Sequence, residues 1–130
     1  MLQDTYNIEI VKMRDEVEEL RAKVIYLENL ISPPSIPRLS YKLELTVKEA
    51  EILGLLIKRG GTVVTRQMIY YAIYGDDQRD TKIIDVFLVK IRKKLDKISI
   101  PRSSLITFWG RGWVLQDPGL TMLREMEQGA

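Results

Sequence analysis

Apolar residues recur at alternating steps of four and three between Tyr6 and Ile31. This spacing is a heptad repeat, with positions lettered a to g, and it predicts a coiled-coil helix over residues 1–31. β-branched residues at position a, combined with leucine at position d, favour two parallel strands. Position a carries Ile10, Val17, Val24 and Ile31, and position d carries Tyr6, Met13, Leu20 and Leu27.

Charged residues flank this apolar seam in a pattern that suits a parallel homodimer. Each g residue faces the e residue of the partner's next heptad, and the three pairs all have opposite signs: Glu9 with Arg14, Glu16 with Arg21, and Lys23 with Glu28. The alternative is a helix that lies on the protein's own core, because off-seam residues such as Ile25, Tyr26 and Leu30 could dock there or support a higher oligomer. The seam predicts dimerisation through Ile10, Met13, Val17, Leu20, Val24, Leu27 and Ile31.

Prolines separate this helix from the rest of the chain. Proline lacks a backbone N–H and restricts the preceding residue to extended geometry, so Pro33, Pro34 and Pro37 predict a semi-rigid linker over residues 32–38. After the linker, residues 41–45 alternate between apolar and polar side chains, which predicts a half-buried strand.

Three helices are predicted next. Thr46 and Glu49 form a capping box that begins the first helix, which ends at the glycine pair 60–61. Thr65 caps a second helix that ends at about residue 74, and a third helix is predicted from about residue 81 to 98. The first helix presents an apolar face made of Ile52, Leu53, Leu56 and Ile57.

A hairpin completes the globular part. Its strands are predicted over 105–108 and 113–116, on either side of a glycine-rich turn. The order strand, helix, helix, helix, hairpin predicts an α+β fold, a winged helix-turn-helix over residues 39–117. A tail over 118–130 remains, in which residues 120–126 have the pattern for one or two helical turns that could pack on the wing or fray.

The third helix has the profile of a recognition helix. Residues 82–97 hold six basic against two acidic side chains, and the major groove of DNA admits a helix whose edges carry Lys and Arg. Arg111, between two glycines at the hairpin tip, suits a narrow minor groove. A basic helix face that is merely exposed to solvent would have a similar charge pattern, and an ordinary tight turn could also carry an exposed arginine between two glycines. The helix divides into an apolar stripe of Ile84, Leu88, Ile91 and Leu95 and an opposite face of Lys82, Val86, Lys90, Lys93 and Lys97.

Charge distribution supports a polyanionic ligand. Residues 37–116 hold 15 Lys and Arg against 8 Asp and Glu, whereas residues 1–36 hold 4 against 7 and residues 117–130 hold 1 against 3. The predicted winged helix is therefore a basic domain between acidic flanks, which favours nucleic acid as the partner.

Composition argues against catalysis. The 130 residues include no Cys and no His, which removes disulfides, thiolate and imidazole metal ligands and the usual general bases near neutral pH. We expect no enzymatic activity, no metal and no cofactor, and Asp76 and Asp77 are better explained as turn residues than as a catalytic pair. With no long apolar run and no basic N-terminal flank, we expect no membrane association and a cytoplasmic protein.

Ordered motifs over residues 43–116 resemble a known family. They include Arg59 to Arg66, Ile73-Tyr74-Gly75, Ile91 to Leu95, and Gly110 to Trp113. In this order and spacing the motifs are similar to the DNA-binding effector domain of OmpR/PhoB-type response regulators. The resemblance implies that the third helix enters the major groove of double-stranded DNA, that the wing enters the minor groove, and that the loop 76–80 touches RNA polymerase.

The resemblance also implies roles for single residues. Lys82, Ile83, Val86 and Lys90 would approach bases or nearby phosphates, while Tyr74, Phe87, Arg92 and Thr107 would brace the DNA backbone. Trp109 departs from the family, which often has an arginine there, and Phe87 replaces a commonly polar residue. The predicted DNA-binding set is Tyr74, Lys82, Ile83, Val86, Phe87, Lys90, Arg92, Lys93, Thr107, Trp109 and Arg111.

The sequence thus predicts a homodimeric, sequence-specific transcriptional regulator. Heptads stand where the family has a phosphoacceptor receiver domain, so we expect the coiled coil to replace phosphorylation in coupling two domains. A parallel coiled coil favours inverted half-sites, the resemblance suggests direct repeats, and a swivelling linker could reconcile them. The alternatives are a winged-helix adaptor that binds another protein, or a DNA-recognition subunit of a larger assembly such as a phage packaging or replication complex.

Overall fold

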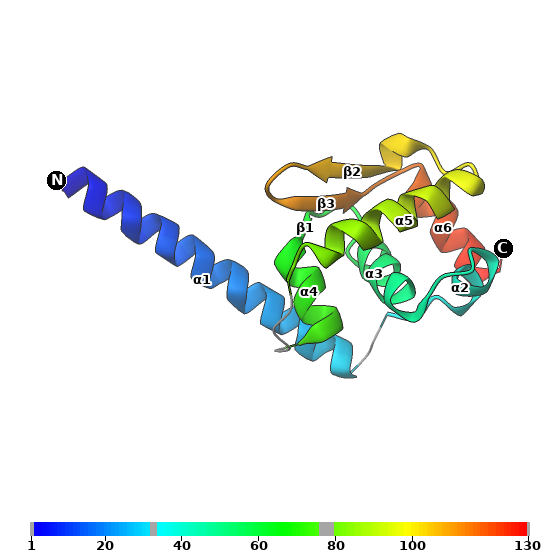
Figure 1. Cartoon of the computed structure of the whole chain (residues 1–130), viewed down its shortest axis with the longest axis horizontal. Coiled ribbons are helices and arrows are strands. Elements are labelled where there is room, and N and C mark those ends of the chain that lie inside the picture. The colour runs from blue at the N-terminus through cyan, green and yellow to red at the C-terminus, as the bar shows by residue number, and fades with distance from the viewer. Residues whose placement is uncertain (1, 32–33, 76–79, 130) are drawn as a thin grey trace.

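A computed structural model describes residues 2–31, 34–75 and 80–129, without the side chains of 2–6 and 29–31. Figure 1 shows a long first helix projecting from a globular part, with its last turns alongside α4. The elements in chain order are α1 (Leu2–Ile31), α2 (Pro37–Lys42), α3 (Val47–Lys58), β1 (Val64–Thr65), α4 (Arg66–Tyr74), α5 (Ile83–Lys97), a 3-10 turn (Arg102–Ser104), β2 (Leu105–Phe108), β3 (Gly112–Leu115) and α6 (Gly119–Gln128).

Helix α3 forms the centre of the core. The predicted capping box is present, since the Thr46 side chain accepts a hydrogen bond from the Glu49 N–H and the Glu49 carboxylate accepts one from the Thr46 N–H. Its predicted apolar face and the stripe of α5 are both buried, as Ile52, Leu53, Leu56 and Ile57 on α3 and Ile84, Leu88, Ile91 and Leu95 on α5. Both helices were therefore predicted correctly.

The hairpin belongs to a three-stranded antiparallel sheet in the order β1-β3-β2. Strands β2 and β3 lie within one residue of their predicted bounds, and β1, which was not predicted, pairs with β3 through Val64 opposite Trp113. Gly112 faces Thr65 so closely that a Cβ atom there would collide with the carbonyl oxygen of Val64. The winged-helix prediction is confirmed, with this glycine allowing the wing to join the body of the domain.

The strand predicted over 41–45 is wrong, because residues 41 and 42 end a helix and residues 43 and 44 form a turn. Helix α2 begins at Pro37, whose fixed φ and missing N–H suit the first turn of a helix. Leu39 and Leu43, four residues apart, are buried on one side, while Tyr41 is exposed. The alternating pattern was the end of a helical pattern that starts at Ile36, and two residues assigned to the linker belong to this helix.

The C-terminal tail is an ordered part of the globular fold rather than an appendage of the wing. Helix α6 packs against α2 and α3, burying Leu120 and Leu123. The Glu127 carboxylate accepts hydrogen bonds from the backbone N–H groups of Arg38 (3.3 Å) and Leu39 (2.9 Å). Because these N–H groups lie in the first turn of α2, where a helix lacks internal partners, α6 caps α2.

Candidate nucleic-acid interface

The polar face of α5 forms a continuous exposed surface. Ile84 and its fellow stripe residues point into the core, so the opposite side is left to solvent. Val86 and Val89 are each 53% exposed, and Val89 is a member of this face that was missing from the predicted set. The exposed residues of α5 are Val86, Val89, Lys90, Lys93, Asp96 and Lys97, and Lys82 at its N-cap is exposed as well.

An ion pair between two helices positions the start of α5. Nη2 of Arg66, at the start of α4, lies 2.9 Å from both carboxylate oxygens of Asp85, in the first turn of α5. The same guanidinium lies 5.8 Å from the ring centre of Trp113 on β3. Arg66 therefore contacts both α5 and β3, a role that the sequence alone did not reveal.

Arg92 joins the middle of α5 to strand β2. Its guanidinium donates hydrogen bonds to the carbonyl oxygen of Leu105 (2.6 Å) and to the Thr107 hydroxyl (2.5 Å). Partial burial lowers the pKa of Arg92, an effect that Asp96 opposes and Arg102 reinforces. The side chain keeps its charge, since an arginine stays protonated in proteins, but it is committed to bracing the wing.

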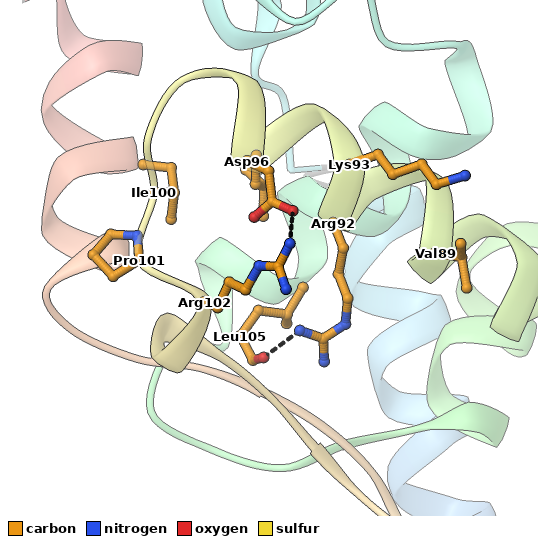
Figure 2. Close-up of a pocket in the computed structure, with 9 residues that line it drawn as sticks. Val89, Arg92, Lys93, Asp96, Ile100, Pro101, Arg102 and Leu105 are labelled. Atoms are coloured by element: carbon orange, nitrogen blue, oxygen red, sulfur yellow. Dashed lines mark hydrogen bonds and ion pairs between the residues drawn. The ribbon is translucent and has the colours of Figure 1, made fainter.

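A cavity of about 280 Å³ lies beside this contact, between the second half of α5 and the segment that leads into β2. Figure 2 shows Arg92 directed at Leu105, and Arg102 directed at Asp96, with which it forms a 3.2 Å ion pair. Apolar residues form part of its wall, including Leu95, Ile100 and Leu105. Arg92 and Lys93, both in the predicted set, line this cavity.

A buried ion pair fixes α5 against α3. Nζ of Lys94 lies 2.6 Å from Oε1 of Glu49, which is 1% exposed, and 2.8 Å from the carbonyl oxygen of Glu44. Burial raises the pKa of Glu49, but the hydrogen bonds from Lys94 and Thr46 and the charge of Lys94 together lower it below its ordinary value. Lys94 is thus bonded to other residues of the fold, whereas its neighbour Lys93 is exposed.

The wing tip exposes aromatic and basic side chains together. Trp109 is 91% exposed and Phe108 is 41% exposed, while Arg111 is also on the surface. Gly110 between them has a φ of +77°, a conformation that glycine adopts without strain, so the tip turns tightly. The exposed surface of the tip is therefore apolar as well as positively charged.

The predicted site residues fall into two groups. Lys82, Val86, Lys90, Lys93, Trp109 and Arg111 are exposed. The others are partly buried: the ring of Tyr74 packs against that of Tyr70 at a tilt of 44°, with ring centres 5.2 Å apart, and Ile83 and Phe87 pack against the core. Arg92 and Thr107 bond to each other. The second group therefore holds α4, α5 and the wing in place.

Other predicted features can be placed only in part. The loop expected to touch RNA polymerase includes residues 76–79, and the linker includes 32–33, all outside the described residues. The side chain of Ile31, in the predicted seam, is also outside the description. Among the described residues there is no cluster of carboxylates that could hold a metal ion. None of the described helices has the length and apolar character needed to span a bilayer.

The heptad seam of α1 is exposed along its described length. The exposed fractions are 45% at Val17, 61% at Leu20, 50% at Val24 and 56% at Leu27. Ile10 and Met13 are exposed as well, so none of the described elements covers the apolar stripe. Val17, Leu20 and Val24 of this stripe line one wall of a groove of about 490 Å³, whose other wall is formed by residues between Arg59 and Met68.

Comparison with known proteins identifies relatives of the globular part. Residues 40–115, which include every element from α3 to β3, match the family model described as "Transcriptional regulatory protein, C terminal". The chain is 46% identical over 82 residues to proteins named cell cycle response regulator CtrA from Brucella anthropi, Brucella ovis and Brucella abortus. The alignment covers 62% of this chain and 35% of each relative, so the chain spans about a third of their length.

Proposed function

Because this chain belongs to the family of C-terminal domains of transcriptional regulatory proteins, and is a DNA-binding rather than an enzymatic protein, we propose that it reads a specific sequence in double-stranded DNA. In this proposal α5 lies in the major groove and the wing reaches the adjacent minor groove. Lys82, Lys90 and Lys93 contact phosphates and base edges, and Arg111 enters the minor groove.

The exposed basic face of α5 is the observation that carries this proposal. Lys82, Lys90 and Lys93 are exposed and none of them has a carboxylate partner among the ion pairs of the described residues. Arg66 and Arg92, by contrast, are bonded to groups of the same domain. Lys82, Lys90 and Lys93 are thus available on the face that would meet DNA, while Arg66 and Arg92 join α5 to α4 and to β2.

The second part of the proposal is that α1 makes the protein a parallel homodimer. Burying the exposed seam of Ile10, Met13, Val17, Leu20, Val24 and Leu27 against a second copy would remove a continuous apolar stripe from water. Two tethered domains bind a two-part site far more tightly than either does alone.

Replacing Lys90 and Arg111 by alanine is expected to weaken DNA binding at every salt concentration. Each cation that contacts a phosphate contributes roughly one unit to the slope of log affinity against log salt, so the slope should fall by about two per domain. Fluorescence anisotropy of a labelled mixed-sequence duplex across a salt series measures both quantities.

The control is a Lys42→Ala, Lys12→Ala double variant, which loses the same net charge from exposed positions away from α5 and the wing. It should bind nearly as tightly as the wild type. If the wild type does not bind even at low salt, or if the two double variants behave alike, the proposed surface is wrong.

Trp109 is expected to report directly on contact between the wing and DNA. The protein has two tryptophans, of which Trp113 is 5% exposed and Trp109 is 91% exposed. Adding an unlabelled duplex should quench and shift the emission of the wild type, because only Trp109 can change its environment. A Trp109→Phe variant, which leaves Trp113 alone, should show almost no change. An equal change in both proteins would place the DNA away from the wing tip.

A further inference from the structure

Helix α1 is docked on the globular domain by its last turns. Ala22 and Ile25 are 0% and 2% exposed, and α4 is the element that α1 contacts most. Tyr26 lies over Gly75, where a Cβ atom would come within 3.3 Å of its ring. Glu28 forms a 3.1 Å ion pair with Arg59 at the end of α3. These contacts join α1 to the domain without relying on the linker.

The docked side of α1 is not the side that carries the heptad seam. Counting from Val24 at position a, Ala22 is at position f and Ile25 at position b, on the face opposite a and d. The seam residues Val17, Leu20 and Val24 are about half exposed in the same docked helix. One helix can therefore pack on its own domain and on a second copy at once.

We propose that α1 acts as a rigid arm, so that the dimer recognises DNA half-sites arranged as an inverted repeat. This inference rests on the proposed function, in particular on a parallel coiled coil. The two α1 helices of such a coiled coil are related by a twofold axis, and every element fixed to them is related by the same axis. Because α4 is fixed to α1 and Arg66 ties α4 to α5, the two recognition helices are related by that axis.

A direct repeat would require a different arrangement of one subunit. Its globular domain would have to turn by half a revolution relative to its own α1, which would expose Ala22 and Ile25 and separate Glu28 from Arg59. The docking contacts oppose such a turn. The inverted arrangement keeps all of them.

The test is a selection of binding sites from a pool of random duplexes, using the full chain. The expected result is enrichment of two half-sites in inverted orientation. In anisotropy measurements, reversing one half-site of the selected duplex, at unchanged spacing, should weaken binding by about a hundredfold, because only one domain can then bind. Enrichment of direct repeats or of single half-sites would overturn the inference while leaving DNA binding intact.

A variant whose α1 cannot dock on the globular domain tests the rigid arm independently of dimerisation. Ala22→Glu with Ile25→Glu places charges on the docked face and leaves the seam unchanged, so the protein should remain a dimer by light scattering. The ratio of its affinities for the selected duplex and for the duplex with one reversed half-site should fall toward one. A dimeric variant that keeps the full preference would overturn the rigid arm, whereas a failure of the pool to enrich any site would overturn the proposed function itself.

Discussion

Replacing Glu49 by alanine is expected to lower the free energy of unfolding by about 3 kcal/mol, since removing one partner of a buried ion pair typically costs 3–5 kcal/mol. The estimate is at the low end because Lys94 is 23% exposed and keeps its hydrogen bond to the Glu44 carbonyl. Part of the loss comes from the capping box, as Thr46 loses the carboxylate that accepts its N–H. Urea unfolding at a fixed protein concentration measures the change.

The effect of this substitution should depend on pH in a defined direction. The pKa of Glu49 is lower in the folded protein than its ordinary value of 4.5. A carboxylate with a lowered pKa stabilises the fold fully above its unfolded pKa and loses this contribution as the pH falls through the folded pKa. The difference between wild type and Glu49→Ala should therefore be constant at neutral pH and shrink below about pH 4.5.

Glu51→Ala is the matched control, with the same change two residues along the same helix. Glu51 is 45% exposed and pairs with Lys48 at 3.7 Å on the surface, so its loss should change stability by less than about 0.5 kcal/mol. Equal effects of the two substitutions would show that the buried pair adds nothing beyond a surface pair. An effect of Glu49→Ala that persists unchanged at low pH would point to lost packing rather than lost charge.

Local patterns in the sequence predicted most of the winged helix. The capping box of α3 and the apolar stripe of α5 depend on residues within one helix, and a short window of sequence contains all of them. The strand over 41–45 was predicted wrongly because an alternating pattern of only five residues fits both a strand and the end of a helix. The longer pattern from Ile36 through Leu39 to Leu43 has the helical period, and Pro37 at the first turn is its start signal.

Contacts between distant residues could not be predicted in the same way. Arg66 and Asp85 are 19 residues apart, and Glu49 and Lys94 are 45 apart, so their pairing depends on how the helices pack. The predicted DNA-binding set held Arg92, from the family resemblance, beside Lys93, from the charged face of the helix, yet Arg92 turns toward β2 and Lys93 remains exposed. The basic residues that stabilise the fold could be distinguished from those available to DNA only once the packing was known.

Helix α1 shows how two readings of one pattern can be compatible. The sequence offered either a coiled coil or a helix packed on the core. The structure buries Ala22 and Ile25 on one face and leaves Val17 and Val24 exposed on the other. The end of the helix is thus packed on the core, as the second interpretation predicted. The exposed seam is still available for the proposed coiled-coil dimer.

A Val17→Lys, Val24→Lys variant is expected to convert the dimer into a monomer. Both residues are at position a, where a lysine in each strand would place like charges together inside the seam and remove two apolar layers. Light scattering should give the mass of one chain, and affinity for a duplex with two half-sites should fall by roughly 10²-fold or more, because the tethering advantage is lost.

The control for this variant makes the same change outside the seam. Ile8 and Val11 are 65% and 45% exposed on α1 and occupy positions f and b. Ile8→Lys with Val11→Lys adds the same charge to the same helix, so any general attraction to DNA rises equally in both proteins. This control should stay dimeric and bind the two-part duplex at least as tightly as the wild type. If instead the Ile8 and Val11 variant becomes monomeric while the Val17 and Val24 variant stays dimeric, the interface lies on the opposite face and the twofold argument for inverted half-sites falls with it.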